Sequence, residues 1–153
     1  MPQSLSQIHV HLVFSTKNRI PFLTNDDIRA EMHNYLGGLS NKHHCPVMCV
    51  GGATDHIHIL ALLGRETSQA DWVRDLKRAS SLWIKERFKG MGLDDFAWQS
   101  GYGCFTIHPE YLKKTIDYVE NQMEHHKKMN FQEEYRAALT KLGIQWDERY
   151  VWE

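Results

Sequence analysis

Residues 55–60 constrain this chain most, because they place two histidines one residue apart inside an apolar run. Side chains on a β-strand alternate between two faces, so His56 and His58 point one way while Ile57 and Ile59 point the other. The pattern predicts a strand with a buried underside and two imidazoles above it. Two neutral imidazoles can bind a divalent metal and leave positions open for substrate. The alternative is a half-exposed strand that carries histidines on its outer face without binding a metal.

The size and composition favour one ordinary globular domain. The chain has 153 residues, of which 42% are hydrophobic and 24% are charged, enough to bury a single core. No apolar run approaches the ~20 residues that span a bilayer, and residues 1–7 do not resemble a signal peptide. The three cysteines include no Cys-x-x-Cys pair, which favours a reduced chain. We therefore expect a cytoplasmic protein with no membrane partner.

The remaining chain alternates between strand and helix patterns. Strand patterns occupy residues 8–15, 46–50 and the run after Asp55, and residues 96–107 suggest a bent strand or hairpin. Helical spacing is found in four segments: 24–39, 68–88, 109–123 and 131–142.

This order predicts an α+β fold, with a ferredoxin-like antiparallel sheet and helices packed on one face. We expect residues 1–153 to form a single domain. Within it, residues 131–153 form a C-terminal helix and an aromatic tail, which packs on its own subunit or on a partner.

A second His-x-His pair, His9 and His11, lies on the outer face of the first predicted strand. His11 could lie near a metal on the neighbouring strand, but nothing downstream singles it out. We therefore expect both residues at the surface or behind the metal ligands.

A stripe of basic and hydroxyl side chains runs along the second predicted helix, although the net charge of the chain is −1. Its members fall at helical intervals on one face: Arg74, Lys77, Arg78, Ser81 and Lys85. Such a stripe is usually a solvated face. Because few acidic residues interrupt it, it is also a candidate for binding the phosphates of a nucleic acid.

Tyr118 and Gln122 stand at positions i and i+4 of the third predicted helix, so their side chains should share a face. That face adjoins the predicted core positions Val119 and Met123, where it could meet the sheet. From the helix alone, Tyr118 would be a boundary aromatic and Gln122 a solvated residue. If this face of the helix meets the histidine pair, Gln122 would supply an amide oxygen as a third metal ligand. Tyr118 would then place its phenol next to the metal.

These motifs resemble the single-tyrosine HUH transposases of the insertion sequence 200/605 family. The combination of His-x-His with a downstream Tyr-x-x-x-Gln carries the likeness, since His-x-His alone is weak. The similarity runs nearly end to end and includes residues 11–17, Gly51-Gly52, residues 76–81, 96–102 and 146–152.

The resemblance implies a DNA transposase that cleaves and rejoins single-stranded DNA at the hairpins marking the ends of an element. Tyr118 would attack the scissile phosphate, forming a 5′-phosphotyrosine and releasing a 3′-OH. A Mg²⁺ or Mn²⁺ ion held by His56, His58 and Gln122 would polarise the phosphate. No nucleotide cofactor is implied, because the covalent intermediate keeps the free energy of the phosphodiester. The resemblance also implies a homodimer, in which each tyrosine helix commonly meets the partner's histidine pair.

Three other assignments are possible for this sequence. A histidine-triad hydrolase would need histidine at the third alternate position, which is Leu60. An HUH nuclease of replication or conjugation would share the chemistry, but the chain is short and has no helicase-like or primase-like extension. A domesticated or non-catalytic protein would bind hairpin DNA without forming an adduct.

Overall fold

The computed structural model describes residues 2–153. In chain order, its elements are β1 (His9–Ser15), η1 (Lys17–Arg19), α1 (Asp26–Lys42), β2 (Val47–Gly52), β3 (His56–Leu62), α2 (Gln69–Arg87), β4 (Gly103–Thr106), η2 (Pro109–Tyr111), α3 (Leu112–Glu120), α4 (Gln122–His125) and α5 (Phe131–Lys141). Both η elements are short 3₁₀-helices.

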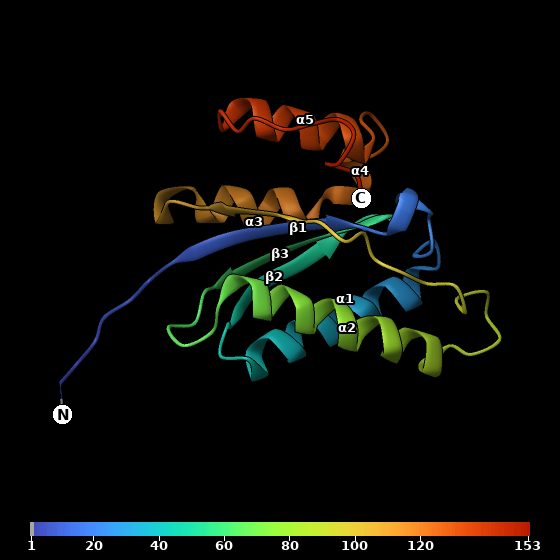
Figure 1. The fold of residues 1–153 in the computed structure, drawn as a ribbon, viewed down its shortest axis with the longest axis horizontal. Coiled ribbons are helices and arrows are strands. Elements are labelled where there is room, and N and C mark those ends of the chain that lie inside the picture. The colour runs from blue at the N-terminus through green and yellow to red at the C-terminus, as the bar shows by residue number, and fades with distance from the viewer. Residues whose placement is uncertain (1) are drawn as a thin grey trace.

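The four strands form one antiparallel sheet in the order β2-β3-β1-β4. Helices α1 and α2 lie together on one side of this sheet (Figure 1). With α1 joining β1 to β2 and α2 joining β3 to β4, this is the ferredoxin-like arrangement. The predicted α+β class is therefore confirmed. The register pairs Val13 with His58 and Ser15 with His56, so both histidines lie over the two central strands.

One face of the sheet carries the main core. Phe14, Ile57 and Ile59 point into it and are fully buried against α1 and α2, which contribute Leu36 and Trp72. Burying each such side chain stabilises the fold by roughly 1.5–3 kcal/mol. The two helices begin where the sequence provides caps: the Asn25 side chain accepts hydrogen bonds from two backbone amides, and Ser68 accepts one from Asp71.

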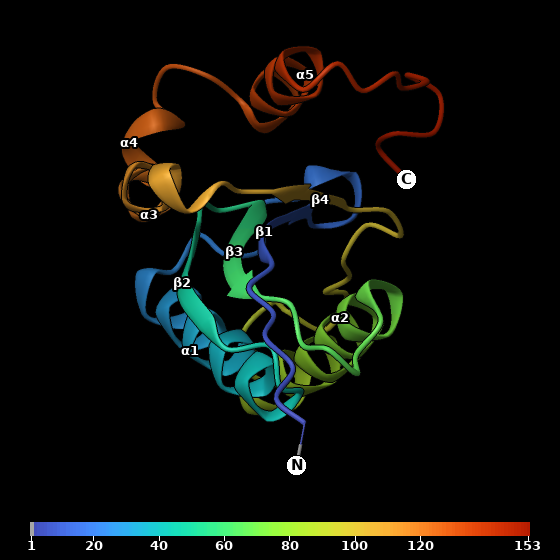
Figure 2. The same cartoon turned by 90° about the vertical axis from the view of Figure 1, so that its left-hand side faces the viewer.

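The other face of the sheet is covered by α3 and α5 (Figure 2). The expectation that helices pack on one face was therefore incomplete. A second core, formed by Val13, Phe131, Tyr135 and Leu139, lies under α5. Gly51 allows α3 to lie on β2, because a Cβ there would collide with the carbonyl oxygen of Val119. A glycine at this position is therefore part of how the chain positions the tyrosine helix.

The third predicted helix is broken. It begins as η2, continues as α3 and stops at Asn121, where ψ is 23°, before α4 resumes the helical path. Met123, which was expected in the core, is 39% exposed. That part of the prediction is wrong. Between residues 96 and 107 only Gly103–Thr106 is a strand; Trp98 forms an isolated bridge with Thr16.

The aromatic tail packs on its own chain. The backbone amide of Gly101 donates to the carbonyl oxygen of Glu153 at 2.7 Å. Arg136 on α5 forms a two-pronged ion pair with Glu148, and Trp152 contacts Phe131 and Tyr135. The tail thus holds α5 against the sheet. Within residues 2–153, no helix combines the length and the apolar character needed to cross a membrane.

Candidate metal and tyrosine site

His56 and His58 are both buried on the second face of the sheet, as the alternation of β3 requires. Their rings lie 5.0 Å apart, centre to centre. Around them, α3, α4 and α5 bring together Tyr118, Gln122 and Glu134, which come from three different helices. The predicted histidines, tyrosine and glutamine are therefore neighbours in space.

The hydrogen bonds of His56 orient its Nε2 atom toward Gln122. The Nδ1 atom lies 2.8 Å from a carboxylate oxygen of Asp55, a contact that favours the proton on Nδ1, and in the neutral ring Nε2 then keeps a lone pair. The Gln122 Nε2 group donates to the Tyr118 carbonyl oxygen at 3.3 Å, which turns Gln122 Oε1 toward His56 Nε2 at 3.0 Å. In the neutral ring with Nδ1 protonated, both of these atoms can bind a cation placed between them.

The Nε2 atom of His58 is buried and makes no hydrogen bond of good geometry within the described residues. Glu134 Oε1 lies 3.0 Å away from it in a poorly aligned position. The Nδ1 atom of His58 lies 2.7 Å from Nε2 of His11. Burial lowers the pKa of His58 to about 4. At neutral pH the imidazole is therefore uncharged, the form that binds a metal.

Glu134 adds a carboxylate that was not predicted from the sequence. It is 8% exposed, and its second oxygen lies 3.1 Å from Nε2 of His126. Burial alone would raise the pKa of Glu134, but its interactions with His126 and His58 hold that pKa well below its usual range. Glu134 is therefore a carboxylate at neutral pH, held between two histidines.

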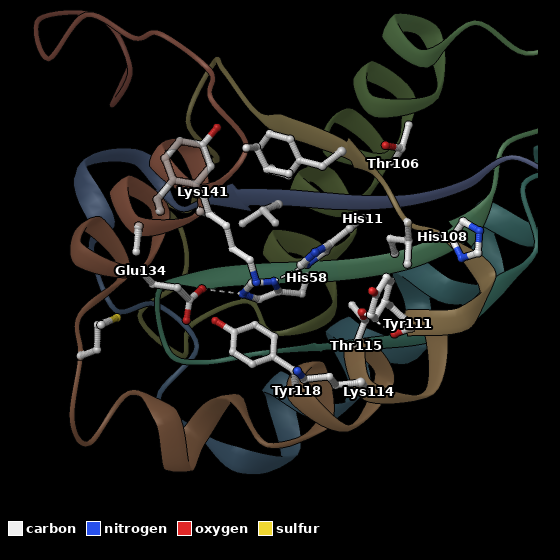
Figure 3. A pocket seen from close by; sticks show the side chains of 18 residues that line it. His11, His58, Thr106, His108, Tyr111, Lys114, Thr115, Tyr118, Glu134 and Lys141 are labelled. Atoms are coloured by element: carbon white, nitrogen blue, oxygen red, sulfur yellow. Dashed lines mark hydrogen bonds and ion pairs between the residues drawn. The ribbon is translucent and has the colours of Figure 1, made fainter.

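Tyr118 is half-buried beside this cluster, and its ring centre lies 5.9 Å from that of His58. Its hydroxyl is directed toward Glu134 and His58 (Figure 3). Burial, together with the negative charge of Glu134, raises the pKa of the phenol above its usual value. The phenol is therefore protonated at neutral pH, and it becomes a nucleophile only if that proton is removed as it reacts.

This donor set fits a divalent cation. One ligand atom each from His56, His58 and Glu134 lies within 4.8 Å of the others, and Gln122 Oε1 adjoins the first of them. Two imidazole nitrogens with a carboxylate and an amide oxygen suit Mn²⁺, and less closely Mg²⁺. Nε2 of His58 has no well-aligned hydrogen-bond partner among residues 2–153 and lies 3.0 Å from the carboxylate of Glu134, so the two groups are placed to bind one ion.

The helical spacing of residues 131–139 indicates where Glu134 lies. In α5, the residues facing the sheet include Phe131, Tyr135 and Leu139, and Glu134 lies on that same stripe by helical spacing. A carboxylate on a buried stripe requires a partner. His9 is buried and does not lie at the surface. His11 lies behind a candidate metal ligand, as expected, because its Nε2 atom is 2.7 Å from Nδ1 of His58.

A single chain completes this cluster. Tyr118 and Gln122 lie beside the histidines of their own chain, so the expected exchange of tyrosine helices between subunits is not needed to form it. The homodimer itself stays a prediction.

The predicted basic stripe lines a groove of about 460 Å³ between α2 and residues 96–102. Within the stripe, Lys77 differs from the other members. Its ammonium donates to the carbonyl oxygens of Gln99, Ser100 and Gly101 at 2.9, 3.2 and 2.6 Å. It also lies 5.0 Å from the ring centre of Phe14. Lys77 therefore ties α2 to the loop, whereas Arg78 is exposed on the same groove.

Comparisons with known proteins place this geometry in context. The family profile described as "Transposase IS200 like" matches residues 4–122. A candidate transposase from Deinococcus radiodurans R1 is 21% identical, with a TM-score of 0.63 over 80% of this chain and 96% of that one. A REP-associated tyrosine transposase bound to a REP hairpin is 13% identical, with a TM-score of 0.52 over 78% of this chain and 68% of that one. Comparison with curated proteins gives no significant match.

We expect metal-free protein to bind one Mn²⁺ per chain, measured by isothermal titration calorimetry. His58→Ala should abolish binding, and Glu134→Gln should weaken it at least tenfold, about 1.4 kcal/mol, because the amide keeps the shape and loses the charge. Glu124→Gln, an exposed residue that pairs with Lys127, is the matched control and should bind normally. Wild-type affinity in Glu134→Gln would remove Glu134 from the ligand set.

Proposed function

The chain belongs to the family of IS200-like transposases, and we propose that it cleaves and rejoins single-stranded DNA at hairpin-marked ends through a phosphotyrosine at Tyr118. The observation that carries the proposal is the position of this phenol: its hydroxyl is directed toward a buried cluster of metal-binding side chains (Figure 3). A tyrosine in a purely structural role would not need such neighbours.

In the proposed cleavage step, the phenolic oxygen of Tyr118 forms a bond to the scissile phosphorus. The bond from phosphorus to the 3′ oxygen breaks, the phenol loses its proton, and the 3′ oxygen gains one. The product is a 5′-phosphotyrosine and a free 3′-OH. In rejoining, a 3′-OH attacks the same phosphorus and the tyrosine leaves. One phosphodiester is exchanged for another, so no nucleotide cofactor is required.

The side chains around Tyr118 have separate tasks in this proposal. His56, His58, Gln122 and Glu134 would hold the divalent cation, Mg²⁺ or Mn²⁺. When bound, this cation supplies positive charge that polarises the phosphate. Asp55 orients His56 through its Nδ1 proton, and His126 holds the carboxylate of Glu134 in place. Gln122 also links the cluster to the Tyr118 backbone.

Hairpin binding is supported by the structural neighbour that is bound to a REP hairpin. We propose that Arg74, Arg78, Ser81 and Lys85 contact the DNA backbone along the groove beside α2. Lys77 is the remaining member of the predicted stripe. We propose that it supports DNA binding indirectly, because it holds the loop that forms the other side of this groove.

Incubation with Mn²⁺ and a single-stranded oligonucleotide carrying the element's end should give a protein–DNA adduct that resists denaturation. Tyr118→Phe should abolish the adduct and leave hairpin affinity within about twofold, because it removes one oxygen from the site. Gel electrophoresis of labelled DNA measures the adduct. An adduct of undiminished yield in Tyr118→Phe would disprove the assignment, while hairpin binding without any adduct in the wild type would favour the non-catalytic alternative.

Two residues of the basic stripe, Arg78 and Lys77, should respond differently to substitution, the first in DNA affinity and the second in stability. Arg78→Ala should lower hairpin affinity and flatten its salt dependence by about 0.9 units of slope, with unchanged thermal stability. Lys77→Ala should lower the free energy of unfolding by about 2 kcal/mol, because three carbonyl groups lose a charged donor. Titrations at several salt concentrations and thermal melts measure the two effects. Identical behaviour of the two variants would contradict the distinction.

A further inference from the structure

A cleft of about 740 Å³ opens between α3 and α5 and ends at the candidate site. Its inner end is lined by His58, Tyr118 and Glu134, and its outer part extends past Tyr111 and His108 (Figure 3). One wall is α5, which lies beyond residues 4–122 matched by the family profile. The family match therefore does not cover the α5 wall of this cleft.

The lining of the cleft combines apolar surface with two lysines. Phe105 and Tyr135 present aromatic rings inside it, and Tyr111, which is 58% exposed, stands at its rim. Lys114 comes from α3 and Lys141 from α5, so positive charges lie on both walls. Neither lysine takes part in the ion pairs found among residues 2–153. Both ammonium groups are thus available to a negatively charged ligand.

We infer that this cleft binds the unpaired nucleotides next to the scissile phosphate, with their bases against the aromatic rings and their phosphates at Lys114 and Lys141. The inference rests on the proposed function. Single strands bind where aromatic rings and a positive groove occur together, because each unpaired base offers a face for stacking. The volume is that of a pocket for a small ligand, within a range of about 300–1,000 Å³, which suits one or two nucleotides and no duplex.

The test measures binding separately from cleavage, in full-length protein carrying Tyr118→Phe so that no adduct forms. The probe is a fluorescein-labelled thymidine decamer, which forms no hairpin, and anisotropy gives its affinity at several salt concentrations. Lys114→Ala with Lys141→Ala should flatten the salt dependence by about 1.4 units of slope, since each single-strand phosphate contact contributes about 0.7. Lys113→Ala with Lys128→Ala is the matched control, because both residues are exposed and neither lines the cleft.

Stacking has its own pair of variants. Tyr111→Ala should weaken decamer binding at least about fivefold, whereas Tyr111→Phe, which keeps the ring, should bind like its parent. Because Tyr111 is largely exposed, its truncation should leave the thermal melt unchanged.

Three results would overturn the inference. The first is an unchanged salt slope in the Lys114 and Lys141 variant, and the second is an equal loss in its matched control. The third is an equal loss of affinity for a blunt hairpin stem, which would make the lysines part of a duplex-binding surface. Absence of a phosphotyrosine adduct in the wild-type protein would refute the proposed function instead, and it would leave the decamer result interpretable as single-strand binding.

Discussion

The convergence of potential metal ligands above β3 is the constraint on which the rest of the site depends. His56 Nε2 faces Gln122 Oε1 at 3.0 Å, and Glu134 Oε1 lies 3.0 Å from Nε2 of His58. Buried polar and charged groups are unfavourable unless each has a partner, and a proton or a cation between these atoms provides one. The cluster that these atoms form is carried by β3, α4 and α5. Binding a divalent ion is the simplest way to satisfy it.

The two faces of the sheet divide the work between stability and chemistry. The face toward α1 and α2 contributes Phe14, Ile57 and Ile59 to the buried hydrophobic core. The other face carries the histidines and is covered by α3 and α5 with a cleft between them. Because α5 is fixed by the tail through Arg136 and Glu148, the C-terminal segment helps to position Glu134 although it lies far from the histidines in sequence. A rigid sheet can then support a site whose parts come from separate helices.

Much of this arrangement follows from sequence periodicity. The alternation of β3 predicts that His56 and His58 share a face, and the helical spacing brings Gln122 near Tyr118 even though the helix breaks at Asn121. Other features depend on contacts between distant segments. Nothing in the local pattern separates Lys77 from Arg78, because the carbonyl groups that Lys77 binds lie on a loop more than twenty residues later. The approach of α5 to the sheet, and with it the role of Glu134, is likewise a tertiary property.

The most direct test of the account is anomalous X-ray diffraction from crystals of the full chain grown with Mn²⁺. The account predicts one strong peak per chain, bounded by His56, His58, Gln122 and Glu134 of the same molecule, with the Tyr118 hydroxyl facing it. A chain with Mn²⁺ bound elsewhere, or one whose histidines take the metal with Gln122 supplied by a partner subunit, would contradict it.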